Sequence, residues 1–136
     1  MPPYAHTVEL EIRPRGDGKA QDILAVGNRT LRLHLDEEGR LHAIRLGLVG
    51  GELQDADVAS RQPLSAGQWH AITVRYDLAR LVLDIDGEEQ GGVDVAPIAD
   101  SDRHNFMLLG CGIAGFWNPA NHFTGDIRNL SLHGHP

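Results

Sequence analysis

The sequence has very little cysteine. Cys111 is the single cysteine among 136 residues, so a disulfide within the chain and a zinc site of four cysteines are both excluded. Without such cross-links the fold depends on its hydrophobic core, and a chain of this length is long enough for one core. We therefore expect a single domain over residues 1–136, with Cys111 as a small, inert side chain.

Basic residues are also scarce. The chain has 12 Lys and Arg against 19 Asp and Glu, which gives a formal charge of -7 at pH 7. Phosphate binding needs clustered Lys and Arg, so this balance argues against nucleic-acid or anionic-membrane partners. No apolar run approaches the roughly 20 residues of a membrane-spanning helix, so we expect no membrane insertion.

The first residues, Met1 to His6, lack the basic and apolar regions of a secretory signal. The chain is either intracellular or part of a longer protein that carries its own signal. We favour the second alternative, because predicted strands lie close to both ends of the chain. On this reading the expected location is extracellular or periplasmic.

The sequence lacks helical periodicity and is dominated by alternation of apolar and polar residues, which is typical of β-strands. Gly, Pro and Asx turns separate about nine or ten such segments, as expected of a sandwich or jelly roll. The nearly all-apolar segment 106–110 is expected to be a central strand, and 50–62 a loop with a short edge strand. The other predicted strands are 7–13, 22–26, 30–36, 40–48, 68–75, 80–86, 92–95 and 123–132.

Three motifs resemble those of a known family. Gly67-Gln68-Trp69-His70 and Leu83-Asp84-Ile85-Asp86-Gly87 resemble the hairpin of laminin-G-like domains, and Phe123-Thr124-Gly125-Asp126-Ile127 resembles their closing strand. The resemblance covers residues 7–133. It implies an all-β, two-sheet antiparallel β-sandwich, a concanavalin-A-like jelly roll, in which the first and last strands are neighbours.

The motif residues also have a structural interpretation. Trp69 is expected to close one end of the core, because a side chain of that size buries a large area. His70 is expected to be structural as well. Gly125 is expected in a strand, where a side chain would crowd the neighbouring backbone or where the strand bends, and a β-bulge is the preferred interpretation.

Paired carboxylates offer little support for catalysis. A glycoside hydrolase needs two carboxyl groups about 5 to 9.5 Å apart. Glu9 and Glu11 share one strand face, as do Asp84 and Asp86, but exposed strands commonly carry such charges. The acidic strand motif of laminarinase-type glucanases is missing. We therefore do not expect an enzyme.

Two kinds of metal site remain open. The resemblance implies calcium at the rim of the sandwich, since several laminin-G-like domains hold one ion there with two aspartates and backbone carbonyls; the candidates among the loop acids are Asp22, Asp100 and Asp102. His34 and His42 are predicted to face each other across a hairpin, close enough to share a transition metal. The alternative for the histidines is a plain polar sheet face.

The Gly-rich loop from Gly112 to His122 carries the predicted ligand site. Trp117 lies between Gly and Pro residues, and amide and imidazole groups flank it, a set suited to the apolar face and the hydroxyls of a sugar. Alternatively, Trp117 folds over the core as a lid. The predicted ligand-binding residues are Trp117, Asn118, Asn121 and His122, with Arg103 and His104 of the preceding polar loop.

These features predict a non-catalytic, lectin-like carbohydrate-binding module, an accessory domain of a larger secreted or surface protein. A protein-interaction or spacer module shares every fold-level feature and is the first alternative. A glycan hydrolase or lyase is the second.

Overall fold

The structure is a computed structural model that describes residues 5–16, 18–26, 31–96, 107–109, 112–114, 118–120 and 123–135. Within these residues the chain is all-β, as predicted, and none of them forms a helix that could cross a membrane. The strands are β1 (Ala5–Arg13), β2 (Gln21–Val26), β3 (Leu31–Leu35), β4 (Leu41–Val49), β5 (Glu52–Ala59), β6 (His70–Tyr76), β7 (Arg80–Ile85), β8 (Glu88–Asp94), β9 (Met107–Leu109), β10 (Gly112–Ala114), β11 (Asn118–Ala120) and β12 (Asp126–His135).

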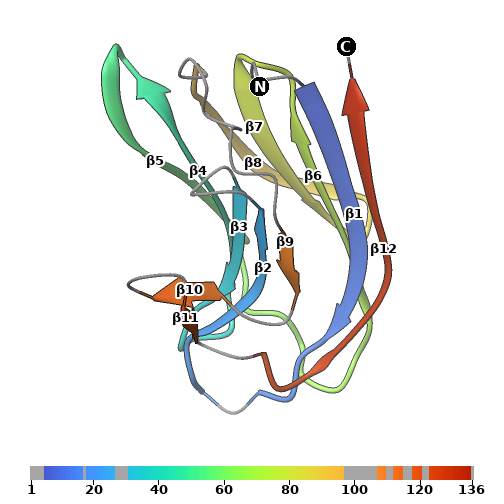
Figure 1. The fold of residues 1–136 in the computed structure, drawn as a ribbon. Helices are drawn as coiled ribbons and strands as arrows, with labels where there is room; N and C mark the ends of the chain where they lie inside the picture. Colours follow the sequence, from blue (N-terminus) through green and yellow to red (C-terminus); the bar gives the residue numbers. More distant parts are fainter. Residues whose placement is uncertain are drawn as a thin grey trace.

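Two antiparallel sheets form a sandwich (Figure 1). One has the strand order β12-β1-β6-β7-β8 and the other β5-β4-β3-β2-β9, while β10 and β11 form a separate hairpin. The first and last long strands are neighbours, with Val8 opposite Leu132 and Ile12 opposite Ile127. The predicted two-sheet architecture and this pairing are confirmed.

Alternation along the strands builds the core between the sheets. On β3 the leucines at every second position are buried while Arg32 and His34 point away from the core. The same pattern holds on β1, β6 and β7. The fully buried apolar side chains from these strands include Val8, Ile12, Leu31, Leu33, Ile72, Val74, Leu81 and Leu83.

Four strand predictions need correction. The strand predicted over 92–95 is β8, which already begins at Glu88. Segment 52–59 is a regular edge strand, β5, rather than mostly loop, and its register with β4 is unbroken. Residues 112–114 and 118–120 of the predicted loop form a short hairpin. The predicted central strand is the outermost described strand of its sheet, where β9 pairs with β2 alone.

Trp69 does not close the core. Its half-buried ring lies 3.8 Å from the Arg128 guanidinium carbon and 4.9 Å from that of Arg13. Both arginine side chains are exposed on the outer surface of the β12-β1-β6 sheet. Because successive residues of a strand face opposite sides, the buried position of His70 directs Trp69 outward.

The core aromatic is instead Tyr76, whose hydroxyl donates a hydrogen bond to the Val95 carbonyl at 3.0 Å. Arg45, which is fully buried on β4, places its guanidinium carbon 3.9 Å from the centre of the Tyr76 ring. A cation over an aromatic face is stabilised by the quadrupole of the ring. The sandwich interior therefore contains a charged group that the alternation pattern does not predict.

Gly125 lies where the chain approaches β1 very closely. A Cβ atom at this position would overlap the carbonyl oxygen of Arg13 and the ring of Phe123. A side chain here would crowd the neighbouring backbone, as expected, but the preferred prediction of a β-bulge at Gly125 is wrong. The β-bulge lies further along β12, where the pairing with β1 shifts and Asn129 has a φ of 56°.

Candidate functional site

Outward-facing polar side chains gather near the β3–β4 turn. We call this group the histidine cluster; it consists of Asp22, Arg32, His34, Asp36, His42 and Asp57. In register, His34 lies opposite His42, and their ring centres are 6.1 Å apart. The predicted facing of these two histidines is confirmed.

Asp22 anchors one half of the cluster. Its Oδ1 accepts a hydrogen bond from Nε of Arg32 at 2.6 Å and lies 2.8 Å from Nδ1 of His34. The Asp22 side chain is 1% exposed, whereas that of Arg32 is 41% exposed. The aspartate therefore balances the charge of the guanidinium at Nε, while Nη2 lies 3.3 Å from Nδ1 of His34 and part of the side chain faces solvent.

His42 anchors the other half. Its Nε2 lies 2.8 Å from Oδ2 of Asp36 and its Nδ1 lies 2.9 Å from Oδ1 of Asp57. Burial of the ring acts to lower the pKa of His42, but hydrogen bonds to the two carboxylates outweigh burial and raise it.

Asp36, one of the two carboxylates that contact His42, also accepts hydrogen bonds from the backbone. Its Oδ1 accepts hydrogen bonds from the backbone amides of Glu38 and Arg40, both at 2.9 Å. Burial acts to raise the pKa of Asp36, but the hydrogen bonds from His42 and from these two amides outweigh it and lower that pKa. The β3–β4 turn is thus fixed by a carboxylate in its charged form.

The contacts of the histidine cluster are those of a polar sheet face. Both ring nitrogens of His42 are engaged by carboxylates, which leaves that histidine no ring nitrogen for a metal. In the part of the chain that the structure describes, no group of three or more His, Cys, Asp or Glu side chains is arranged to hold an ion.

The structure describes one of the three calcium candidates, Asp22. Asp22 is buried in its ion pair with Arg32 and in its contact with His34, so its carboxylate does not fit a calcium site. Asp100 and Asp102 lie outside the described residues. Calcium binding at these two aspartates stays a prediction.

Most of the predicted ligand-binding residues also lie outside the described residues: Arg103, His104, Trp117, Asn121 and His122. Asn118 begins β11, and its backbone pairs with that of Ala114 on β10. Strand β10 packs beside β2, the strand that carries Asp22 (Figure 1). The hairpin that flanks residues 115–117 is therefore adjacent to the sheet that carries the histidine cluster.

Neighbouring side chains engage three of the four carboxylates considered for catalysis, those of Glu11, Asp84 and Asp86. Hydrogen bonds from Arg128 and Asn129 lower the pKa of Glu11, which disfavours the protonated form that a general acid needs. Asp84 lies 2.9 Å from Nη2 of Arg75, and Asp86 lies 3.1 Å from Nδ1 of His70. These contacts favour structural roles for the three carboxylates.

Sequence reasoning found the two histidines but missed Arg32, Asp36 and Asp57 as their partners. Alternation does place Arg32 beside His34 on the same outer face. The contribution of Asp22 depends on the register of β2 with β3, which shifts between Asp22 and Leu24. A shift of that kind has no signature in the sequence.

Known structures with the same fold include carbohydrate-binding and laminin domains. The CBM40 domain of the Ruminococcus gnavus IT-sialidase, bound to α2,3-sialyllactose, matches with a TM-score of 0.73 and 18% identity over 96% of this chain and 75% of that chain. Domains LG4-5 of the mouse laminin α1 chain match with a TM-score of 0.73 and 23% identity over 95% of this chain and 35% of that chain. Domain 4 of AbnA, a GH43 extracellular arabinanase from Geobacillus stearothermophilus in complex with arabinotriose, matches with a TM-score of 0.62 and 18% identity over 98% of this chain and 62% of that chain.

No curated protein matches the chain in sequence. A family model described as the concanavalin A-like lectin/glucanases superfamily matches residues 1–136. This match agrees with the two-sheet antiparallel sandwich and with the laminin-G-like motifs. The chain belongs to the concanavalin A-like lectin/glucanase superfamily.

Proposed function

We propose that this chain is a non-catalytic carbohydrate-binding module, an accessory domain of a larger secreted or surface protein. The observation that carries the proposal is the packing of β10 beside β2, next to the sheet of the histidine cluster. In this proposal Trp117, Asn118, Asn121 and His122 bind the glycan together with Arg32 and His34, and Arg103 and His104 extend the site.

The chemistry of this surface suits a sugar. Hydroxyl groups both donate and accept hydrogen bonds, and the exposed part of Arg32 offers donors while Asp57, with its side chain 46% exposed, offers acceptors. An aromatic ring such as that of Trp117 can cover the apolar face of the sugar. The engagement of His42 by two carboxylates keeps the surface ordered before the ligand arrives.

Two of the similar structures support this proposal. The sialidase and arabinanase domains described above are parts of larger enzymes and carry bound saccharides. The arabinanase is described as extracellular, which agrees with the proposed extracellular or periplasmic location.

A protein-interaction or spacer module is the second candidate, favoured by Leu53, which is 59% exposed on the edge strand β5. A docking surface usually needs a continuous apolar patch. Two other large apolar side chains are exposed in the described ranges, Leu78 in the β6–β7 turn and Leu132 on β12. Because β5 packs against β8, β12 lies at the opposite edge of the sandwich from Leu53. This separation favours the glycan-binding function.

A panel of neutral and acidic glycans tests the proposal directly. We expect the whole chain to bind a subset of the panel, the Trp117→Ala variant to bind none, and Asn121→Ala to bind about 1 to 3 kcal/mol more weakly because a sugar hydroxyl loses its partner. Trp69→Ala is the matched control, since Trp69 lies on the outer surface of the other sheet. The proposal fails if the wild-type chain binds no glycan.

A further inference from the structure

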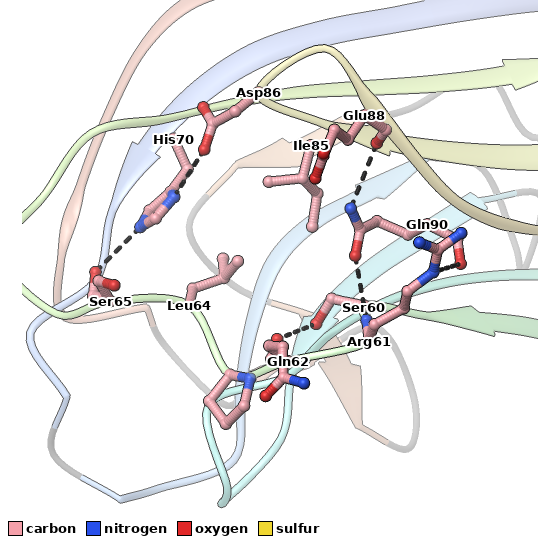
Figure 2. A pocket seen from close by; sticks show the side chains of 11 residues that line it. Ser60, Arg61, Gln62, Leu64, Ser65, His70, Ile85, Asp86, Glu88 and Gln90 are labelled. Carbon is pink, nitrogen blue, oxygen red and sulfur yellow. Dashed lines mark hydrogen bonds and ion pairs between the residues drawn. The ribbon is translucent and has the colours of Figure 1, made fainter.

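A pocket opens at the rim of the sandwich, apart from the histidine cluster. It has a volume of about 300 Å³, which is at the lower end of the range for small-molecule sites. We call it the rim pocket. Its lining comes from the β5–β6 segment, from His70 and from the β7–β8 hairpin (Figure 2), and the residues used below are Arg61, Leu64, His70, Ile85, Glu88 and Gln90.

The walls of the rim pocket are tied together in the absence of a ligand. The backbone amide of Arg61 donates to Oε1 of Gln90 at 3.0 Å, which joins the β5–β6 segment to β8. On the other side, Nε2 of His70 donates to the Ser65 carbonyl at 3.0 Å, and Nδ1 of the same ring lies 3.1 Å from Asp86. A ligand would therefore enter a preformed site and order few side chains.

Two charged groups at the pocket, those of Arg61 and Glu88, form no ion pair with another described residue. Nε of Arg61 donates to the Gln90 carbonyl at 3.3 Å, but the guanidinium forms no ion pair with any carboxylate of the described ranges. The exposed carboxylate of Glu88 likewise has no basic partner among the side chains that the structure describes. Both side chains are exposed and line the pocket, so both are available to a ligand there.

The lining of the rim pocket also includes apolar side chains. Ile85 is 6% exposed, and the half-buried Leu64 packs against the core. Figure 2 shows these two side chains between His70 on one side and Gln90 on the other. The pocket thus combines a small apolar surface with polar groups around it.

This combination distinguishes between ligand classes. Arg61 can only donate hydrogen bonds and ionised Glu88 can only accept them. For an anion the attraction of Arg61 is offset by the repulsion of Glu88, and for a cation the two effects are reversed. Each hydroxyl of a neutral saccharide ring, in contrast, can form a hydrogen bond with either group. The C–H face of the same ring can pack on Leu64 and Ile85.

We infer that the rim pocket binds one neutral saccharide ring, as a second site on the module. The inference rests on the proposed function for its ligand class but not for its position, because none of the histidine cluster lines this pocket. A glycan chain that occupied both sites would gain from their linkage.

Amide chemical shifts of the whole chain, titrated with the methyl glycosides of glucose, galactose and mannose, test the inference. We expect at least one of them to give saturable shifts at Arg61, Glu88 and Gln90. Arg61→Ala and Glu88→Ala should each weaken that binding about tenfold. Arg15→Ala and Glu52→Ala, which change exposed residues that do not line the pocket, should leave it unchanged.

Further measurements distinguish a failure of this inference from a failure of the proposed function. Saturable shifts at the pocket that persist in Trp117→Ala support a second site, whether or not the panel binding survives. Panel binding that depends on Trp117 without any shift at the pocket overturns the rim-pocket inference alone. Binding of glucuronate or glucosamine more tightly than every neutral glycoside overturns the ligand class.

Discussion

His70 on β6 and Asp86 in the β7–β8 turn are directly joined, with Nδ1 of the histidine 3.1 Å from the carboxylate. The same carboxylate accepts the backbone amide of Ala71 at 2.8 Å. The two halves of the laminin-G-like hairpin motif therefore meet through side chains as well as through strand pairing. His70 is structural, as predicted.

Asp86 has two roles that substitutions can separate. It has a φ of 53°, which Asn tolerates better than Ala, and its side chain accepts hydrogen bonds. We expect Asp86→Ala to lower the free energy of unfolding by about 1 to 3 kcal/mol, and Asp86→Asn to lower it less. Urea unfolding measures both, and equal losses in the two variants would contradict these roles.

The position of Trp69 leads to a second prediction. A fully buried tryptophan costs about 3 to 5 kcal/mol when truncated to alanine, but this half-buried ring loses mainly its contacts with Arg13 and Arg128. We expect Trp69→Ala to cost about 1 to 2 kcal/mol. Leu83→Ala, at a fully buried position, serves as the core reference. A loss for Trp69→Ala as large as that for Leu83→Ala would contradict the surface position.

Alternation was sufficient to predict the class of fold and most strands, because strands that face a core on one side bury every second residue. It failed for β5, where Glu52 to Asp55 are all exposed, so this part of the strand has no alternation of apolar and polar residues. The prediction for Trp69 was wrong because it relied on the size of the side chain. Trp69 directly precedes the inward-facing His70, and successive side chains along an extended chain face opposite sides.

The candidate site was predictable only in part. The facing of His34 and His42 follows from the turn at Glu37 to Gly39, which is short and local. The partners Asp22 and Asp57 come from neighbouring strands whose registers depend on the whole sheet. The rim pocket brings residues 60–65 together with residues 85–90, and no spacing in the sequence indicates that contact.

His42 should make the stability of the chain depend on pH. Its pKa is raised in the folded chain from an ordinary value of 6.5, so its stabilising contribution is complete below about pH 6.5 and is lost as the pH rises through the raised value. We expect the free energy of unfolding to fall across this range in the wild-type chain and to fall less in His42→Gln. His133→Gln, which changes an exposed histidine, is the control. The same slope in His42→Gln as in the wild-type chain would exclude this role.

Calcium can be tested through stability. If Asp100 and Asp102 hold a calcium ion, the folded state gains stability from the bound ion by mass action. We then expect a chelator to lower the melting temperature, added calcium to restore it, and Asp102→Asn to remove the effect. A melting temperature that does not change across millimolar calcium would exclude a structurally important site.

The central claim is that this module binds glycan beside the β10–β11 hairpin. Calorimetric titration of the strongest glycan from the panel into the wild-type chain, Trp117→Ala and Trp69→Ala tests it most directly. We expect saturable binding to the wild-type chain and to Trp69→Ala, and no measurable binding to Trp117→Ala, which should remain folded with a loss well below the ~3 to 5 kcal/mol of a buried tryptophan. Unchanged binding to Trp117→Ala, or unfolding of that variant, would contradict the claim.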